Sequence, residues 1–207
     1  MKTFISLLRG INVSGQNKIR MAELKRLYEA LGLFNVVPYI QSGNVIFDCA
    51  EQGPVPLARL IETEIARSFE ISVRVFLRDK NRFQQIIDGN PFSHQRSEDP
   101  EKLHITFLSD SPTKSALSNL PLPTDPKGYG AGSDDEFLGY DQEIYLFCPN
   151  GYGRTKFSNT FFERKLSVSA TTRNWKIVNA LNEIANQRGA RRPQRKEKSD
   201  FKSPAFG

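Results

Sequence analysis

The chain has 207 residues, of which 38% are hydrophobic and 25% are charged, with 15 phenylalanines and a formal net charge of +6. This composition excludes an intrinsically disordered chain, which would be poor in aromatic and β-branched residues, and no apolar run approaches the roughly 18 residues that a membrane span needs. The length allows one domain or two small ones, and the short apolar part of the N-terminal sequence favours a cytoplasmic protein over a secreted one.

Strand and helix patterns alternate along the first half of the chain. Their order is strand, helix, strand, strand, helix, strand, which is the ferredoxin-like or split βαβ pattern. Pro38 indicates that the first hairpin strand lies at a sheet edge or contains a bulge. The predicted elements are a strand at 3–8, a helix at 21–31, a hairpin within 36–48, a helix at 56–69 and an alternating strand at 71–78.

The second half starts in the same order. A connecting helix at 79–88, capped by Asp79 and ended by Gly89, leads outward through NPF into it. The repeat then differs, because a long amphipathic helix from Thr172 to Gln187 replaces the last strand. The other predicted elements are a strand at 102–108, a helix within 111–120, paired strands at 135–140 and 143–148, and a helix over 157–166.

These patterns predict an α+β fold of two tandem ferredoxin-like repeats, the second ending in helices, followed by a disordered basic tail. The predicted boundaries are a first subdomain at 1–78, a connecting helix and loop at 79–100, a second subdomain with its C-terminal helix at 101–188, and the tail at 189–207.

Positive charge is concentrated in two loop-to-helix regions and in the tail. Residues 7–28, 154–176 and 189–207 carry net charges of +4, +5 and +4, so the rest of the chain carries −7. Such clustering indicates an anionic partner. The alternative is that the helical lysines and arginines in these regions only solvate outer helix faces.

The opening loop, LLRGINVSGQNKIRM at residues 7–21, holds more hydrogen-bond donors than a turn requires. A glycine turn before a helix N-terminus offers backbone N–H groups to an anion. Gly10 and Gly15 have the spacing of a P-loop, but Gln16 and Asn17 stand where that motif needs Lys and Ser or Thr. Alternatively, the loop residues serve only the turns. The candidate ligand-binding residues here are Arg9, Gly10, Asn12, Gly15, Asn17, Lys18 and Arg20.

Two further segments could face the same ligand. Gln41, Ser42 and Asn44 lie at the tip of the predicted hairpin, although SGN is also ordinary turn chemistry. The segments GYGRTKFSN and TTRNW add Arg154, Lys156, Arg173 and Asn174. If Thr171 or Thr172 caps the last helix, Arg173 opposes the helix dipole, at a cost of about 0.3–1 kcal/mol unless an anion lies nearby.

Other chemistry receives little support from the sequence. The two cysteines and two histidines form no metal or redox motif. An acidic stretch could bind Mg²⁺, but a solvated hairpin turn is the favoured explanation, because charge runs are usually exposed. We therefore expect no metal site and no cofactor, and no catalytic residue can be identified. The acidic residues are Asp134, Asp135, Glu136, Asp141 and Glu143.

Several motifs in chain order resemble the DUF1697 family of uncharacterised bacterial proteins. The resemblance covers about residues 1–186, and it implies an α+β fold with two ferredoxin-like repeats but no activity, substrate or catalytic residue. Ser14 stands where family members commonly have glycine, and Thr155 where serine is usual; neither change removes a donor. The motifs are LLRGINVSG, MAELKRLYEALG, YIQSGNVIF, NPF and TTRNWKIV.

The leading functional hypothesis is a soluble module that binds a phosphate-bearing ligand, either a nucleic acid or a nucleotide, through the basic glycine-containing loops. The sequence lacks the aromatic RNP1 pattern of RNA-binding sheets of this topology. The alternatives are an enzyme acting on a small anionic metabolite in the groove between the repeats, and an interaction scaffold. No membrane partner is expected, and the oligomeric state is not determined by the sequence. The first hypothesis requires the basic groups near 9–20 and 154–173 to converge.

Overall fold

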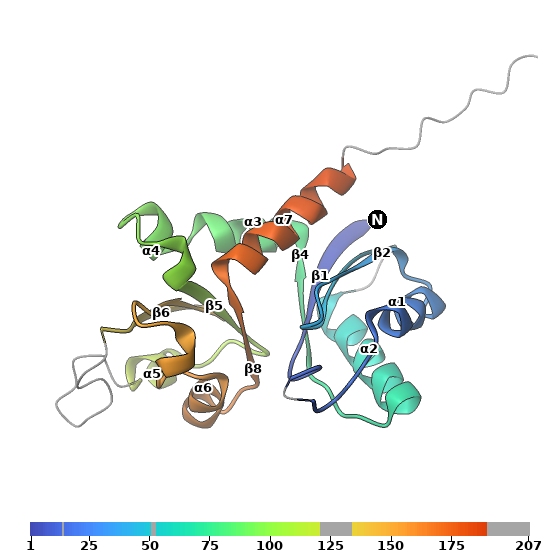
Figure 1. The fold of residues 1–207 in the computed structure, drawn as a ribbon, viewed down its shortest axis with the longest axis horizontal. Coiled ribbons are helices and arrows are strands. Elements are labelled where there is room, and N and C mark those ends of the chain that lie inside the picture. Colours follow the sequence, from blue (N-terminus) through green and yellow to red (C-terminus); the bar gives the residue numbers. More distant parts are fainter. Residues whose placement is uncertain (14, 51–52, 121–133, 190–207) are drawn as a thin grey trace, which may run out of the picture.

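The computed structural model describes residues 1–13, 15–50, 53–120 and 134–189, and the predicted basic tail beyond Gly189 lies outside this part. The fold is mixed α+β, with two four-stranded antiparallel sheets and several helices (Figure 1). Within the described residues, no helix combines the length and the apolar character needed to cross a membrane.

The first sheet has the strand order β2-β3-β1-β4. Apolar side chains on its outer face pack under two helices, as the helical spacing of the leucines in the sequence requires. Pro38 lies in the edge strand β2, as predicted, because proline cannot donate a hydrogen bond within a sheet. The elements are β1 (Lys2–Leu8), α1 (Met21–Ala30), β2 (Phe34–Tyr39), β3 (Asn44–Cys49), α2 (Pro54–Phe69) and β4 (Val75–Asp79).

The second sheet has the strand order β6-β7-β5-β8. Numbered within its own half, each sheet therefore has the same spatial order of strands. Helices α5 and α6 cover its outer face around a cluster rich in phenylalanine. The elements are β5 (Leu103–Leu108), α5 (Lys114–Ser118), β6 (Glu136–Tyr140), β7 (Glu143–Phe147), the 3₁₀ turn η2 (Tyr152–Arg154), α6 (Asn159–Leu166) and β8 (Ala170–Asn174).

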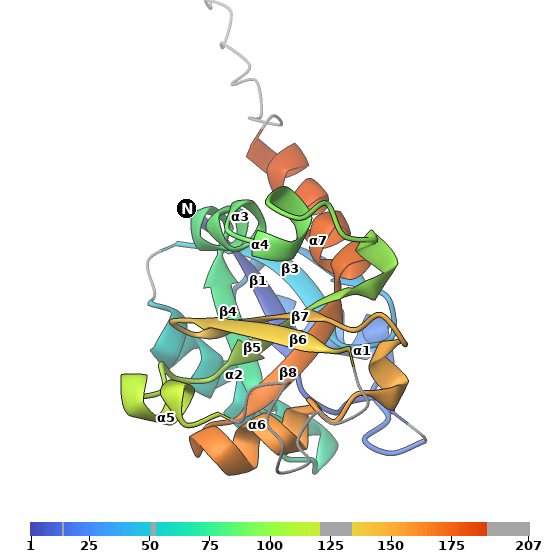
Figure 2. The same ribbon diagram turned by 90° about the vertical axis from the view of Figure 1, so that its left-hand side faces the viewer.

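The inner faces of the two sheets meet in a central cluster that combines residues from both halves. On β1, Ile5 and Leu7 point into this cluster while Phe4 and Leu8 point to the outer core, as the two-residue period of a strand dictates. Helices α3 (Lys80–Asp88) and α7 (Trp175–Gly189) pack together across one end of it. Viewed from the side of the second sheet, β6 passes in front of β1 and β4, with α3 and α7 at the top (Figure 2).

The prediction of a helix from Thr172 was wrong. Ala170–Asn174 is strand β8, paired with β5, and helix α7 begins only at Trp175. β-Branched threonines favour a strand, and the apolar helical period of Trp175, Val178 and Leu181 starts only after them. Asn174, not a threonine, caps the helix: its Oδ1 accepts the N–H of Ile177 at 2.9 Å.

The prediction that NPF leads outward was also wrong. Asn90 caps a short helix, α4 (Pro91–His94), and Phe92 is buried in the central cluster. The predicted Asp79 cap is confirmed, since its side chain accepts the N–H of Arg82 at the start of α3.

Candidate functional site

A pocket of about 400 Å³ lies between the two halves, where the opening loop and the β2–β3 turn approach the edge strand β8. We call it the inter-half pocket. Gly43 permits the close approach of the turn to the loop, because its φ is +73° and a Cβ there would lie 2.7 Å from the side chain of Ile11. The polar side chains that line the pocket are Arg9, Ser42, His104, Tyr152, Thr172 and Arg173, among others.

Arg173 is the most deeply buried charge of this pocket, with 7% of its surface exposed. Burial lowers the pKa of its guanidinium to about 10, so the group is charged at neutral pH. In the described part of the chain, no acidic side chain forms an ion pair with it. Its printed hydrogen bonds run from Nε to Asn44 Oδ1 (2.6 Å), from Nη1 to Thr171 Oγ1 (2.8 Å) and Thr172 O (2.9 Å), and from Nη2 to Leu8 O (2.9 Å) and Ser42 O (3.1 Å).

Arg78 of β4 occupies the corresponding place in the other half. It lies opposite Ile5 in its sheet as Arg173 lies opposite Ile105. Its Nη2 donates to the carbonyl of Leu108, at the end of the other sheet's β5, just as Arg173 donates to Leu8 at the end of β1. The acceptor of Nε differs in charge between the two sites: Arg78 Nε donates to the Glu143 carboxylate at 2.7 Å, whereas Arg173 Nε donates to the neutral Asn44 amide.

The two sites also differ in a side chain of the helix that follows each arginine, α3 after Arg78 and α7 after Arg173. Arg82 and Ile177 hold the same position, because the N–H of each is bound by the capping residue that ends the fourth strand. Arg82 donates to both Glu143 and Asp141, so two arginines face two carboxylates around Arg78. Around Arg173 the corresponding side chains are Asn44 and Ile177, and both are uncharged. The inter-half pocket therefore contains a buried positive charge that its neighbours do not neutralise.

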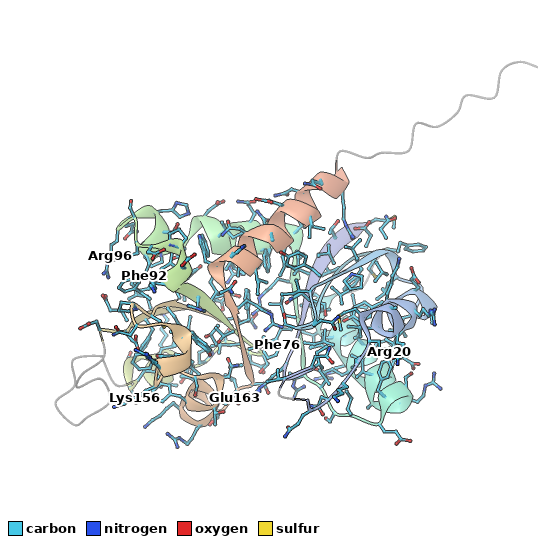
Figure 3. The ribbon with its side chains drawn as sticks, in the orientation of Figure 1. Arg20, Phe76, Phe92, Arg96, Lys156 and Glu163 are labelled. Carbon is cyan, nitrogen blue, oxygen red and sulfur yellow. The ribbon has the colours of Figure 1, made fainter. Side chains whose placement is uncertain are left out.

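Arg9 joins the opening loop to the second half through Glu163 of α6. Its Nε donates to Glu163 Oε1 at 2.6 Å and its Nη2 to Oε2, which is a bidentate pair. This hydrogen bonding raises the pKa of Arg9 and lowers the pKa of Glu163. Glu163 also accepts the N–H of Ala170, and Figure 3 places it on the side of the second half that faces the first.

His104 and Tyr152 form the wall of the pocket on the second half. Their rings stack with centroids 4.9 Å apart, and Tyr152 Oη donates to Thr172 Oγ1 at 3.1 Å. Burial lowers the pKa of His104, so its ring is neutral at neutral pH. This wall therefore offers ring faces and hydroxyl groups, without added charge.

The structure brings five of the residues chosen from sequence together at the pocket: Arg9, Gly10, Ser42, Arg173 and Asn174. Asn44 lies fully buried behind them as the acceptor of Arg173. Arg173 itself lies on a strand and not in the first turn of a helix, so the predicted conflict with a helix dipole does not arise.

The remaining chosen residues lie in the loop or on the surface. Asn12 and Asn17 adopt left-handed backbone angles, and their side chains donate to backbone carbonyls of Ile19, Gln41 and Gly10. Gly15 is also left-handed. Figure 3 shows Arg20 and Lys156 on opposite sides of the molecule. Lys18, Arg20, Gln41, Arg154 and Lys156 are exposed and do not line the pocket.

Sequence reasoning missed His104, Tyr152 and Ile177, and it did not single out Glu163. Each belongs to the site only through contacts with distant segments. The clearest signal available was an arginine inside each fourth strand, Arg78 and Arg173, since a charge in a buried strand needs specific partners.

The acidic stretch forms arginine pairs. Glu136 binds Arg96 at 2.6 Å, and Glu143 is 1% exposed beneath Arg78. Asp135 is also buried, so a solvated turn does not explain Asp135 and Glu143, whereas Asp134 and Asp141 are exposed as that explanation expects. In the described ranges, no group of three or more His, Cys, Asp or Glu side chains is placed to hold a metal ion.

Comparison with known proteins places these observations in a family without an assigned activity. The model of a family described as "Protein of unknown function (DUF1697)" matches residues 1–145. A solved structure of a conserved bacterial protein from Streptococcus pneumoniae is similar, with a TM-score of 0.65 and 23% identity over 89% of this chain and 98% of that chain. At that identity the likeness concerns the fold alone. No curated protein matches the chain.

Proposed function

Because the chain belongs to the DUF1697 family of proteins of unknown function, we propose its function from the inter-half pocket: it is a binding module for a small molecule that carries a phosphate or carboxylate group. The group lies near Arg9 and Arg173, where the opening loop meets β8. The contacts that bury Arg173 between the two halves support a small ligand more directly than a polymer.

The observation that carries this proposal is the unneutralised charge of Arg173. Neutral acceptors satisfy the hydrogen bonds of its guanidinium, but they do not offset the cost of removing a full charge from water. At the corresponding place around Arg78, Glu143 supplies that offset from within the chain. An anion bound in the inter-half pocket would supply it around Arg173.

The size of the pocket also supports a small ligand. A volume of about 400 Å³ lies within the roughly 300–1,000 Å³ typical of small-molecule sites. A nucleic acid would need a continuous basic track, and the separation of Arg20 from Lys156 works against one. Binding to single-stranded RNA or duplex DNA that increases with length and falls steeply with salt would favour the polymer instead.

Asn44→Asp tests the proposal. The new carboxylate would accept from Arg173 Nε, as Glu143 does from Arg78, and would neutralise the pocket from within. We expect the affinity for inorganic phosphate, adenosine monophosphate and acetate, measured by calorimetry, to fall at least tenfold. The matched control is Asn81→Asp, which adds the same charge on the exposed face of α3.

Equal affinities for the wild type and Asn44→Asp would contradict the role of Arg173. Failure of the wild-type chain to bind any of the three anions would contradict the proposed function as a whole.

We also propose that the two halves are ferredoxin-like repeats, with the first at 1–78 and the second at 101–188. Three observations support this: the same element order in each half, the same strand order in each sheet, and the matching contacts of Arg78 and Arg173. A cytoplasmic location is proposed as well, supported by the two buried free cysteines and tested by fractionation of cells.

A further inference from the structure

The lining of the inter-half pocket also includes apolar side chains that are not fully buried. Ile177, at the position that Arg82 holds in the other half, lines the pocket, as does Val13 of the opening loop. Val13 is 57% exposed and Ile177 is half-buried. Both side chains therefore offer apolar surface within the pocket that a ligand could cover.

The charge in the pocket corresponds to one elementary unit. Glu163 neutralises Arg9 through a bidentate pair, and His104 is neutral because burial lowers its pKa. Arg173 is left as the single unneutralised cation among the described residues that line the pocket. A single negative charge matches it, whereas a phosphate monoester carries about −1.5 to −2 at neutral pH.

We propose that the ligand is a monoanionic organic acid: a carboxylate with a hydrocarbon body that lies against Val13 and Ile177. This inference rests on the proposed anion site and narrows it to one class of ligand. The carboxylate accepts hydrogen bonds near Arg9 in the field of Arg173, and the body covers the apolar wall. Thr172 and Asn174 also line the pocket and add polar atoms to it.

A series of linear carboxylates tests the inference on the full chain. Acetate, butyrate and hexanoate carry the same charge and differ only in the number of methylene groups. Affinity measured by calorimetry should rise about fourfold for each methylene that becomes buried. Hexanoate should also bind more tightly than inorganic phosphate or adenosine monophosphate.

Two substitutions locate the apolar contact. Val13→Thr replaces a methyl group with a hydroxyl, and Ile177→Thr replaces an ethyl group with one. Each should reduce the gain in affinity per methylene to less than about twofold. Val55→Thr is the matched control, because Val55 is 62% exposed at the start of α2 and does not line this pocket. If Ile177→Thr fails to fold, Val13→Thr on the exposed loop still decides the question.

The outcomes separate this inference from the proposed function. Acetate and phosphate binding without dependence on chain length would overturn the organic-acid inference and leave the anion site standing. If Val55→Thr reduced the gain in affinity per methylene as much as Val13→Thr does, the apolar binding would be unspecific. That result would overturn the inference as well. Absence of binding to every probe would remove the anion site itself.

Discussion

Glu143 and Asn44 begin β7 and β3 and accept from corresponding arginines, but only Glu143 carries a charge. Glu143→Gln would leave Arg78 buried and charged beside a neutral amide. We expect the free energy of unfolding, measured in urea, to fall by about 3–5 kcal/mol, because breaking a buried pair leaves an uncompensated charge. At Arg173 the neutral Asn44 amide already holds this position, so the two sites differ in whether the chain itself compensates the buried charge.

The control for that substitution is Glu136→Gln. Glu136 pairs with Arg96 at the surface, with 43% of its side chain exposed. Its loss should change the free energy of unfolding by less than about 1 kcal/mol. If both substitutions lower the free energy of unfolding by the same amount, burial does not set the strength of the Arg78–Glu143 pair.

The lowered pKa of His104 predicts how the free energy of unfolding depends on pH. Burial lowers its pKa below the ordinary value of 6.5, so between the two values the unfolded chain binds a proton that the folded chain does not. This contribution to stability is complete above pH about 6.5 and is lost as the pH falls through the folded pKa. The measurement is urea unfolding at pH 8, 7, 6 and 5.

Comparison with His104→Asn isolates this contribution. The substituted chain lacks the titrating ring, so its stability should fall less between pH 7 and pH 5 than that of the wild type. Parallel curves for the two chains would assign the pH dependence to other groups.

At the scale of single elements, local patterns in the sequence predicted most helices and strands. Leucine spacing identified α1, and the Asp79 cap and Gly89 identified α3. The strand β8 was missed because five residues directly before a strongly periodic helix leave no turn to separate them. Local periodicity cannot place such a boundary, since pairing with β5 decides it.

The boundary between β8 and α7 makes Asn174 a test of this explanation. Asn174→Ala removes the side-chain oxygen that accepts the N–H of Ile177. The free energy of unfolding should fall by about 1 kcal/mol, as for other helix caps. Asn81→Ala, exposed on α3, should cost little or nothing. A similar loss at both positions would mean that Asn174 does not act as a cap.

The site depends on contacts across the whole chain, which explains why only part of it could be predicted. Arg173 meets Asn44 across 129 residues of sequence and Leu8 across 165. Donor-rich loops suggested Arg9 and Ser42, because such loops favour anions. Arg173 was supported by a conflict with a helix dipole that does not arise in strand β8. It could not identify His104 or Ile177, whose place in the pocket is set by the packing of one half on the other.

The central cluster predicts that the two halves unfold together. Phe76 of β4, labelled at the centre of Figure 3, is 2% exposed and packs among residues of both sheets and of α7. Phe76→Ala should cost about 3–5 kcal/mol, since it leaves a cavity in this shared core. Because the core is shared, unfolding should remain a single transition.

Trp175, the single tryptophan of the chain, reports on that cluster from the second half. Its fluorescence and the far-ultraviolet circular dichroism of the whole chain should therefore change at the same urea concentration, in the wild type and in Phe76→Ala alike. Phe161→Ala, in the outer cluster of the second sheet, provides a comparison outside the shared core. If tryptophan fluorescence and circular dichroism separate in Phe76→Ala, the first half unfolds independently, and the pocket between the halves would open before either half is lost.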